Sequence, residues 1–173
     1  MAQYNIDAAH SDILFKVKHL MITTVTGQFN SFNGSFTAEA TDFSDAQVQF
    51  TADINSINTR NEQRDAHLKS NDFFNAEQFP QLLFTSTAFT KSGEGYVLTG
   101  NLTIRDITRA VALQVSYAGT MVDPWGQTKV GFEAEGVIRR KEFGLSWDAV
   151  TEAGGVVVSD EVKLQLNVQF IKQ

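Results

Sequence analysis

The sequence predicts an all-β domain in which about eight antiparallel strands close into a barrel. Apolar and polar residues alternate with a period of two through most of the chain, which is typical of half-buried strands. Turn-forming segments separate the alternating stretches: SGEG from Ser92, RDITR from Arg105 and DPWGQ from Asp123. One charged, helix-like segment, TRNEQRDAHLKSNDFF, interrupts the strands between residues 59 and 74.

Eight segments carry the strand pattern. Six of them have one clearly apolar face, and they cover residues 13–19, 46–54, 96–104, 111–117, 130–138 and 162–170. A seventh spans residues 82–90. The eighth begins at Gly27, and its aromatic residues change phase between Phe29 and Phe32, which predicts a β-bulge in that strand.

The number of strands favours a closed sheet, because closure removes both exposed edges. A barrel of eight strands is just wide enough for packed side chains or for one small ligand. The inward-facing set mixes large residues with small ones, namely Ala46, Ala52, Gly100, Ala134 and Gly136. Two interpretations stay open on this pattern: the small residues leave a lumen, or they complement the large ones in a dry core.

Length and composition narrow the class of protein. A chain of 173 residues with 42% hydrophobic residues suits one domain, residues 1–173, with a sizeable core. The net charge of −6 disfavours nucleic acid as a partner, because phosphate contacts need clustered lysines and arginines. The absence of cysteine excludes disulfides, a thiolate nucleophile and cysteine-bound zinc. No apolar run is long enough to span a membrane, and no signal peptide is visible.

The helix-like segment is interpreted as a lid. Thr59 and Glu62 fit a capping box, and Asn71 can end the helix. Three phenylalanines follow, at Phe73, Phe74 and Phe79, and these rings are expected to close or narrow one end of a barrel. The alternative is an ordinary surface helix that three core phenylalanines anchor.

Candidate catalytic groups are few. Asp7, His10 and Ser11 are crowded into one short segment, and no nucleophile elbow is present, so we interpret them as structural. His67 lacks a second histidine at helical spacing, so no metal site is predicted. The most basic stretch, RRKEFGLSW from Arg139, is flanked by acidic residues and is interpreted as a solvated turn.

Several blocks, in order along nearly the whole chain, resemble the YceI-like family of polyisoprenoid-binding proteins. They are YNIDAAHSDILFKVKHL followed by GQF, then RDAHLKSNDFF with QFPQLLFTST, LTIRDITRAVAL, and GFEAEGVIRRKEFGLSW. Two positions depart from the family pattern: Tyr4 stands where a tryptophan is frequent, and Asp106 where a glycine is common. The resemblance implies an extended lipocalin-like barrel with a long apolar pore that holds one amphipathic lipid, and no catalytic reaction.

We therefore expect non-catalytic carriage or storage of one long-chain lipid of the isoprenoid, isoprenoid quinone or polyprenyl type. The alternatives are a binder of fatty acids or fatty amides, and a structural β-domain with a filled core. No cofactor other than the bound lipid is expected, and a homodimer is a family-level expectation. The protein is expected to be periplasmic or secreted if a signal peptide has been removed, and cytoplasmic if the chain is full length.

The residues expected to contact the lipid are the inward-facing apolar side chains and the aromatic residues near the barrel ends. They are Phe15, Val17, Phe50, Ile54, Phe73, Phe74, Phe79, Leu98, Leu102, Leu113, Val115, Phe132, Phe143, Trp147, Leu164, Leu166 and Val168. Three basic residues near predicted strand ends are candidates for a contact with the headgroup: His19, Arg60 and Arg105.

Overall fold

The computed structural model describes residues 1–148 and 157–173, and strands dominate them. The strands are β1 Ala2–Ile6, β2 Asp12–His19, β3 Thr23–Phe29, β4 Phe32–Ala38, β5 Gln47–Asp53, β6 Ile57–Asn58, β7 Gln81–Ser92, β8 Gly95–Ile104, β9 Ile107–Val122, β10 Thr128–Arg139 and β11 Val158–Lys172. The helical segments are α1 Glu62–Lys69 and the short 3₁₀ turns η1 Ala8–His10, η2 Ile54–Ser56 and η3 Arg140–Phe143.

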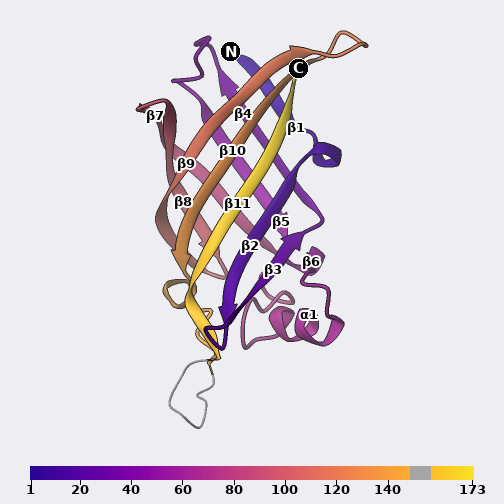
Figure 1. The fold of residues 1–173 in the computed structure, drawn as a ribbon, viewed down its shortest axis with the longest axis vertical. Helices are drawn as coiled ribbons and strands as arrows, with labels where there is room; N and C mark the ends of the chain where they lie inside the picture. Colours follow the sequence, from indigo (N-terminus) through magenta and orange to yellow (C-terminus); the bar gives the residue numbers. More distant parts are fainter. Residues whose placement is uncertain (149–156) are drawn as a thin grey trace.

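The strands form a closed antiparallel barrel (Figure 1). Closure occurs at β1, which pairs with β4 on one side and with the last residues of β11 on the other. The earlier part of β11 pairs with β2 instead. Three pairs of short consecutive strands, β1 with β2, β3 with β4 and β5 with β6, each take the place of one long strand of the barrel. Together with β7 to β11 they make eight strand positions around the barrel. The predicted eight-stranded antiparallel barrel is confirmed.

The break between β3 and β4 lies beside the break between β5 and β6, and the two are hydrogen-bonded to each other. The amide of Asn30 donates to the carbonyl of Ser56 at 3.1 Å, and the amide of Asp53 donates to the carbonyl of Ser31 at 2.9 Å. The predicted bulge between Phe29 and Phe32 is therefore wrong in detail. The phase changes because Asn30 and Ser31, which lie outside the ladder, separate β3 from β4. Their backbone groups bond to Ser56 of η2 and to Asp53 at the end of β5.

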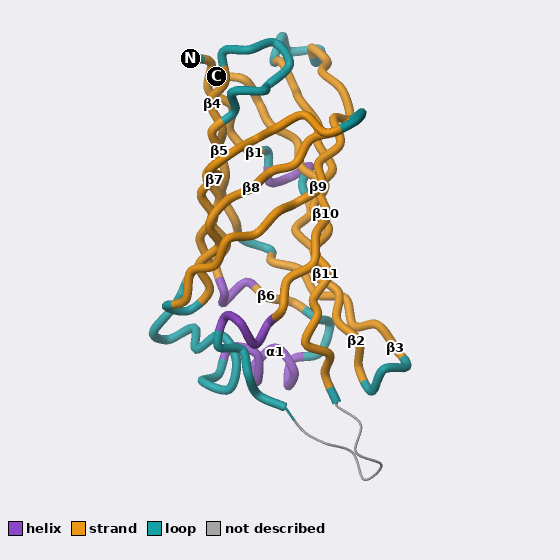
Figure 2. Tube along the Cα trace, turned by 90° about the vertical axis from the view of Figure 1, so that its left-hand side faces the viewer, coloured by secondary structure: helices purple, strands orange, loops and turns teal. Residues whose placement is uncertain are grey.

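The two ends of the barrel differ. Helix α1, the β2–β3 turn and the β8–β9 turn lie at one end, which we call the α1 end (Figure 2). The two termini and the β9–β10 hairpin lie at the other, which we call the terminal end. The helix starts later than predicted, because the side chain of Asn61 rather than Thr59 caps it, accepting from the amide of Arg64 at 3.0 Å. It ends at Ser70 instead of Asn71.

Aromatic rings fill the terminal end. Tyr4 stacks on Phe36 with ring centroids 4.4 Å apart, Phe36 meets Phe170 at 4.9 Å, and Phe43 meets Phe132 at 5.6 Å. Each of these five rings is less than 9% exposed. We call this group the aromatic plug. It closes the end of the barrel opposite to the one at which the sequence predicted aromatic closure.

Candidate functional site

The barrel encloses a cavity of about 430 Å³. Its wall extends from Phe43, Phe132 and Phe170 of the aromatic plug to Leu68 and Trp147 at the α1 end. Between these ends the wall consists mainly of aliphatic and aromatic side chains from the strands. The barrel's own side chains therefore leave a lumen, and the size lies within the usual range for a small-molecule site.

Glycines on the inner face explain why large side chains leave this space. A Cβ atom at Gly27 would lie 2.2 Å from the ring of Phe15, its neighbour across β2 and β3. A Cβ atom at Gly100 would lie 2.5 Å from the ring of Phe84 on the adjacent strand. These rings lie against the bare backbone of the glycines instead of extending across the barrel. Large inward residues therefore line the lumen without filling it.

All but three of the predicted lipid-contacting residues lie on the cavity wall. The wall includes Phe15, Val17, Phe50, Phe73, Phe74, Leu98, Leu102, Leu113, Val115, Phe132, Trp147, Leu164, Leu166 and Val168. The period-two pattern placed the strand residues in this set, because all of them point to one face of a continuous ladder.

The structure does not place Ile54, Phe79 or Phe143 on the wall. Ile54 and Phe143 belong to η2 and η3, beyond the ends of β5 and β10, and are only 2% and 1% exposed. They pack into the core because the strand alternation has ended before them. Phe79 lies beneath the guanidinium of Arg105, with 5.9 Å between its ring centre and the guanidinium carbon.

At the α1 end, Phe73 and Phe74 lie on the wall as predicted, and α1 contributes wall residues of its own. The ring of Phe73 is 5.5 Å from Trp147, and that of His67 is 4.8 Å from Trp147. Exposed wall residues, among them Lys18, His19 and Arg64, lie at this end, which we call the mouth of the cavity. Helix α1 borders it. The helix lies where the lid interpretation expects it. The aromatic plug lies at the opposite end and consists of four strand residues and Phe43 of the β4–β5 loop.

Of the three predicted headgroup residues, only His19 lies on the wall. Arg105 instead links two loops, because it donates to the carbonyls of Phe73 and Gly144, each at 3.1 Å. Arg60 is exposed in a left-handed backbone conformation, with φ of 66°, and does not border the cavity. The position of a basic residue near a predicted strand end therefore does not show whether its side chain borders the cavity or forms hydrogen bonds between loops.

Four other basic residues on the wall were missed: Lys18, Arg64, His67 and Arg140. Arg140 corrects the interpretation of its segment as a solvated turn, since it is only 3% exposed. Extending the alternation of residues 130–138 by one step places Arg140 inward, so the sequence did contain a signal for it. No comparable pattern marks Lys18, which the alternation assigns to the outer face.

Asp7, His10 and Ser11 form a structural network on the barrel wall. The Ser11 hydroxyl donates to the Asp7 carbonyl at 2.8 Å and accepts from the amide of Gln169 at 3.0 Å. The Asp7 carboxylate lies 2.9 Å from His10 Nδ1 and accepts from Lys129 Nζ at 3.2 Å. Burial raises the pKa of Asp7, but the hydrogen bonds from His10 and Lys129 outweigh it, so the pKa lies below the usual range. The hydroxyl bonds to backbone and not to the imidazole, unlike a nucleophile and its base.

Taken together, the closed eight-stranded sheet and the apolar lumen define a lipocalin-like barrel. The YceI-like domain matches residues 4–170, and the chain belongs to this family. Among the described residues, no helix is long and apolar enough to cross a membrane.

Similar proteins include the UPF0312 protein YE1254 of Yersinia enterocolitica, which is 39% identical over 99% of this chain and 87% of its own length. Protein YceI of Salmonella newport is 38% identical, with 99% and 88% of the two chains covered. The YCEI protein of Campylobacter jejuni has a similar structure, with a TM-score of 0.77, 29% identity and 90% of each chain covered.

Two solved structures of lower identity share the fold. Burkholderia cenocepacia BcnA has a TM-score of 0.82 at 23% identity and covers 95% of this chain and 98% of its own. A polyisoprenoid binding domain from Saccharophagus degradans has a TM-score of 0.69 at 15% identity, with 98% of each chain covered.

Proposed function

We propose that this protein binds one amphipathic long-chain lipid, with the chain in the barrel lumen, and carries or stores it without chemical change. The observation that carries the proposal is the cavity of about 430 Å³, whose wall is apolar along the barrel and whose exposed wall residues include Lys18, His19 and Arg64 at the α1 end. An isoprenoid, isoprenoid quinone or polyprenyl lipid matches this shape.

The driving force is the removal of the chain from water, worth about 0.8 kcal/mol per methylene before the costs of binding. A barrel of eight strands is narrow, so it accepts one extended chain more readily than a compact molecule. The structurally similar S. degradans protein is known as a polyisoprenoid binding domain, which is consistent with this ligand class. At 15% identity that likeness concerns the fold, so the proposal depends on the cavity.

The lumen accommodates a fatty acid or fatty amide by the same physics, and this remains the second candidate. A structural β-domain with a filled core is disfavoured, because Gly27 and Gly100 hold neighbouring rings against the wall and leave the lumen open. Periplasmic location and a homodimer stay predictions.

A tryptophan substitution in the lumen tests the proposal. Leu164 lies on the wall, between Phe15 of β2 and Gly136 of β10, whereas its neighbour Gln165 points to the opposite face. We expect Leu164→Trp to lower uptake of a long-chain isoprenoid alcohol at least tenfold, measured on delipidated protein by native mass spectrometry. Gln165→Trp is the matched control and should bind as the parent does. Equal uptake by both folded variants would mean that the chain does not enter the lumen.

A further inference from the structure

The ionisable side chains on the cavity wall of the described residues are all basic. Lys18, His19, Arg64, His67 and Arg140 line the cavity, and no aspartate or glutamate of the described residues does so. This contrasts with the net charge of −6 for the whole chain. The composition of the whole chain, which is rich in acidic residues, therefore does not explain why only basic ionisable residues line the cavity.

These five residues gather at the α1 end, although they come from β2, α1 and η3. The Lys18 amide donates to the Ser159 hydroxyl at 3.1 Å, and Arg140 Nε donates to the carbonyl of the same serine at 2.9 Å. Arg140 Nη1 donates to the Trp147 carbonyl at 2.7 Å, and the His67 ring lies 4.8 Å from the Trp147 ring. Ser159 thus connects Lys18 with Arg140, and Trp147 lies between Arg140 and His67.

Arg140 supplies a fixed positive charge there. Its guanidinium donates to the backbone carbonyls of Ser159, Val158, Leu145 and Trp147 at 2.6–3.1 Å. Asp148 Oδ2 lies 3.9 Å from it and also accepts from Lys141 Nζ at 3.0 Å. The four carbonyl dipoles and the Asp148 carboxylate stabilise the buried guanidinium, which lies on the cavity wall.

The exposed basic side chains at the mouth are available to a ligand. Within residues 1–148 and 157–173, neither the Lys18 ammonium nor the His19 ring makes a hydrogen bond or ion pair. Arg64 uses Nε and Nη2 on Thr59, at 2.8 and 2.5 Å, which leaves Nη1 as a donor. Within the part of the chain that the structure describes, neither Lys18 nor Arg64 forms an ion pair with a carboxylate, so an anionic ligand between them would meet two uncompensated positive charges.

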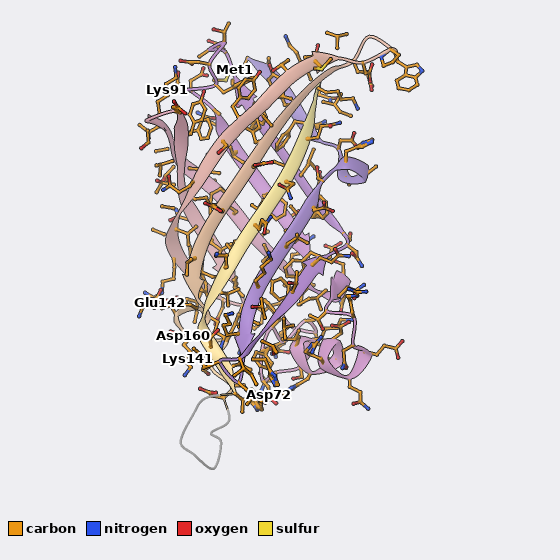
Figure 3. All side chains as sticks on the ribbon, in the orientation of Figure 1. Met1, Asp72, Lys91, Lys141, Glu142 and Asp160 are labelled. Atoms are coloured by element: carbon orange, nitrogen blue, oxygen red, sulfur yellow. The ribbon has the colours of Figure 1, made fainter. Side chains whose placement is uncertain are left out.

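Three described acidic residues at this end, Asp65, Asp72 and Asp160, have hydrogen-bond or ion-pair partners away from the cavity wall or at its edge. Asp72 and Asp160 lie at the α1 end (Figure 3), but neither is on the wall. Asp72 Oδ2 is 2.9 Å from His67 Nε2, and Asp160 accepts from the Lys141 amide at 3.1 Å. Asp65 accepts from the Thr59 amide at 2.8 Å. These carboxylates surround the mouth without entering it.

We propose that the mouth at the α1 end binds an anionic oxygen headgroup, a carboxylate or phosphate, so that the preferred ligand is an acidic long-chain lipid. This inference rests on the proposed function, because it assumes that the chain of the same molecule occupies the lumen. Lys18 and Arg64 would contact the headgroup, and Arg140 would set the positive potential behind them.

The test compares lipids that differ only in charge. Oleate against oleamide, and farnesyl phosphate against farnesol, are titrated into delipidated protein at pH 7.5, and the fluorescence of Trp147, which lies on the cavity wall, reports binding. We expect each anionic lipid to bind at least tenfold more tightly than its neutral partner. The preference should fall as salt is raised, because exposed charges are screened.

The variant Lys18→Gln/Arg64→Gln should lose most of this preference, so that the ratio of the two affinities falls towards one. Its matched control is Lys16→Gln/Lys69→Gln, which removes the same charge from the same two elements at positions that do not line the cavity. The control should keep the preference. Circular dichroism checks that both variants fold, and the comparison within the parent protein needs no variant.

The outcomes separate the two proposals. Tight and equal binding of charged and neutral lipids would overturn the anionic headgroup and leave lipid binding intact. Binding of none of the four lipids would overturn both. Inorganic phosphate and acetate, which lack a chain, should bind at least a hundredfold more weakly than the anionic lipids. Equal affinity for them would show a site for a free anion and overturn the headgroup assignment.

Discussion

At the scale of single residues, Asp7 links three parts of the chain. Its carboxylate contacts His10 of η1 and Lys129 of β10, and the Gln169 side chain of β11 donates to it at 3.4 Å. The side chain is 14% exposed, so these charge-assisted bonds are partly shielded from water. The segment that resembled a catalytic triad in sequence thus fastens the interrupted first strand position to its neighbours.

We expect Asp7→Asn to destabilise the protein by about 1 kcal/mol at pH 7, because the asparagine cannot make the ion pair with Lys129. The folded-state pKa of Asp7 lies below that of the unfolded chain. The contribution is therefore complete above the unfolded pKa and is lost as the pH falls through the folded value. Urea unfolding at a series of pH values from 7 downward measures the difference between parent and variant. A difference that stays constant into the acid range would mean that the charge of Asp7 is not its source.

At the scale of strands, the sequence pattern predicted which side chains face the lumen only where the strand is continuous. Alternation identified the strand residues on the wall, such as Phe50 and Leu166, because a continuous ladder keeps the period of two. It failed for Ile54 and Phe143, which lie in turns immediately after strands. It also could not divide β3 from β4, since that break depends on hydrogen bonds to Ser56, which is distant in sequence.

Close packing between β7 and β8 gives a test at this scale. A Cβ atom at Gly100 would lie 2.5 Å from the Thr85 carbonyl oxygen, and a backbone atom cannot move aside cheaply. We expect Gly100→Ala to destabilise the protein by about 1–3 kcal/mol in urea unfolding. Gly131→Ala is the control, because its nearest contact would be an ordinary 3.4 Å to the Cβ of Ala118. Equal stability of the two variants would contradict the close strand approach at Gly100.

At the scale of the whole molecule, the barrel is asymmetric along its axis. The aromatic plug closes the terminal end, while exposed basic residues and α1 border the mouth at the other. A lipid entering at the α1 end would place its chain towards the plug and its polar head near Lys18 and Arg64. The proposed function thus predicts an orientation for the ligand as well as a binding site.

The sequence predicted the closed barrel but not, from periodicity, whether it was hollow. A dry core and a lumen produce the same alternation, and the difference depends on rings that lie against glycines on neighbouring strands. The plug was missed for a related reason. Tyr4, Phe36, Phe43, Phe132 and Phe170 are far apart in sequence, and only the register of the closed sheet brings them together.

The most direct measurement of the central claim is native mass spectrometry of the purified full chain, followed by solvent extraction and mass analysis of what is released. We expect one lipid per protein chain, and an extracted molecule with a long hydrocarbon chain. A bare protein mass that stays unchanged after incubation with quinones, prenols and fatty acids would contradict the proposed function.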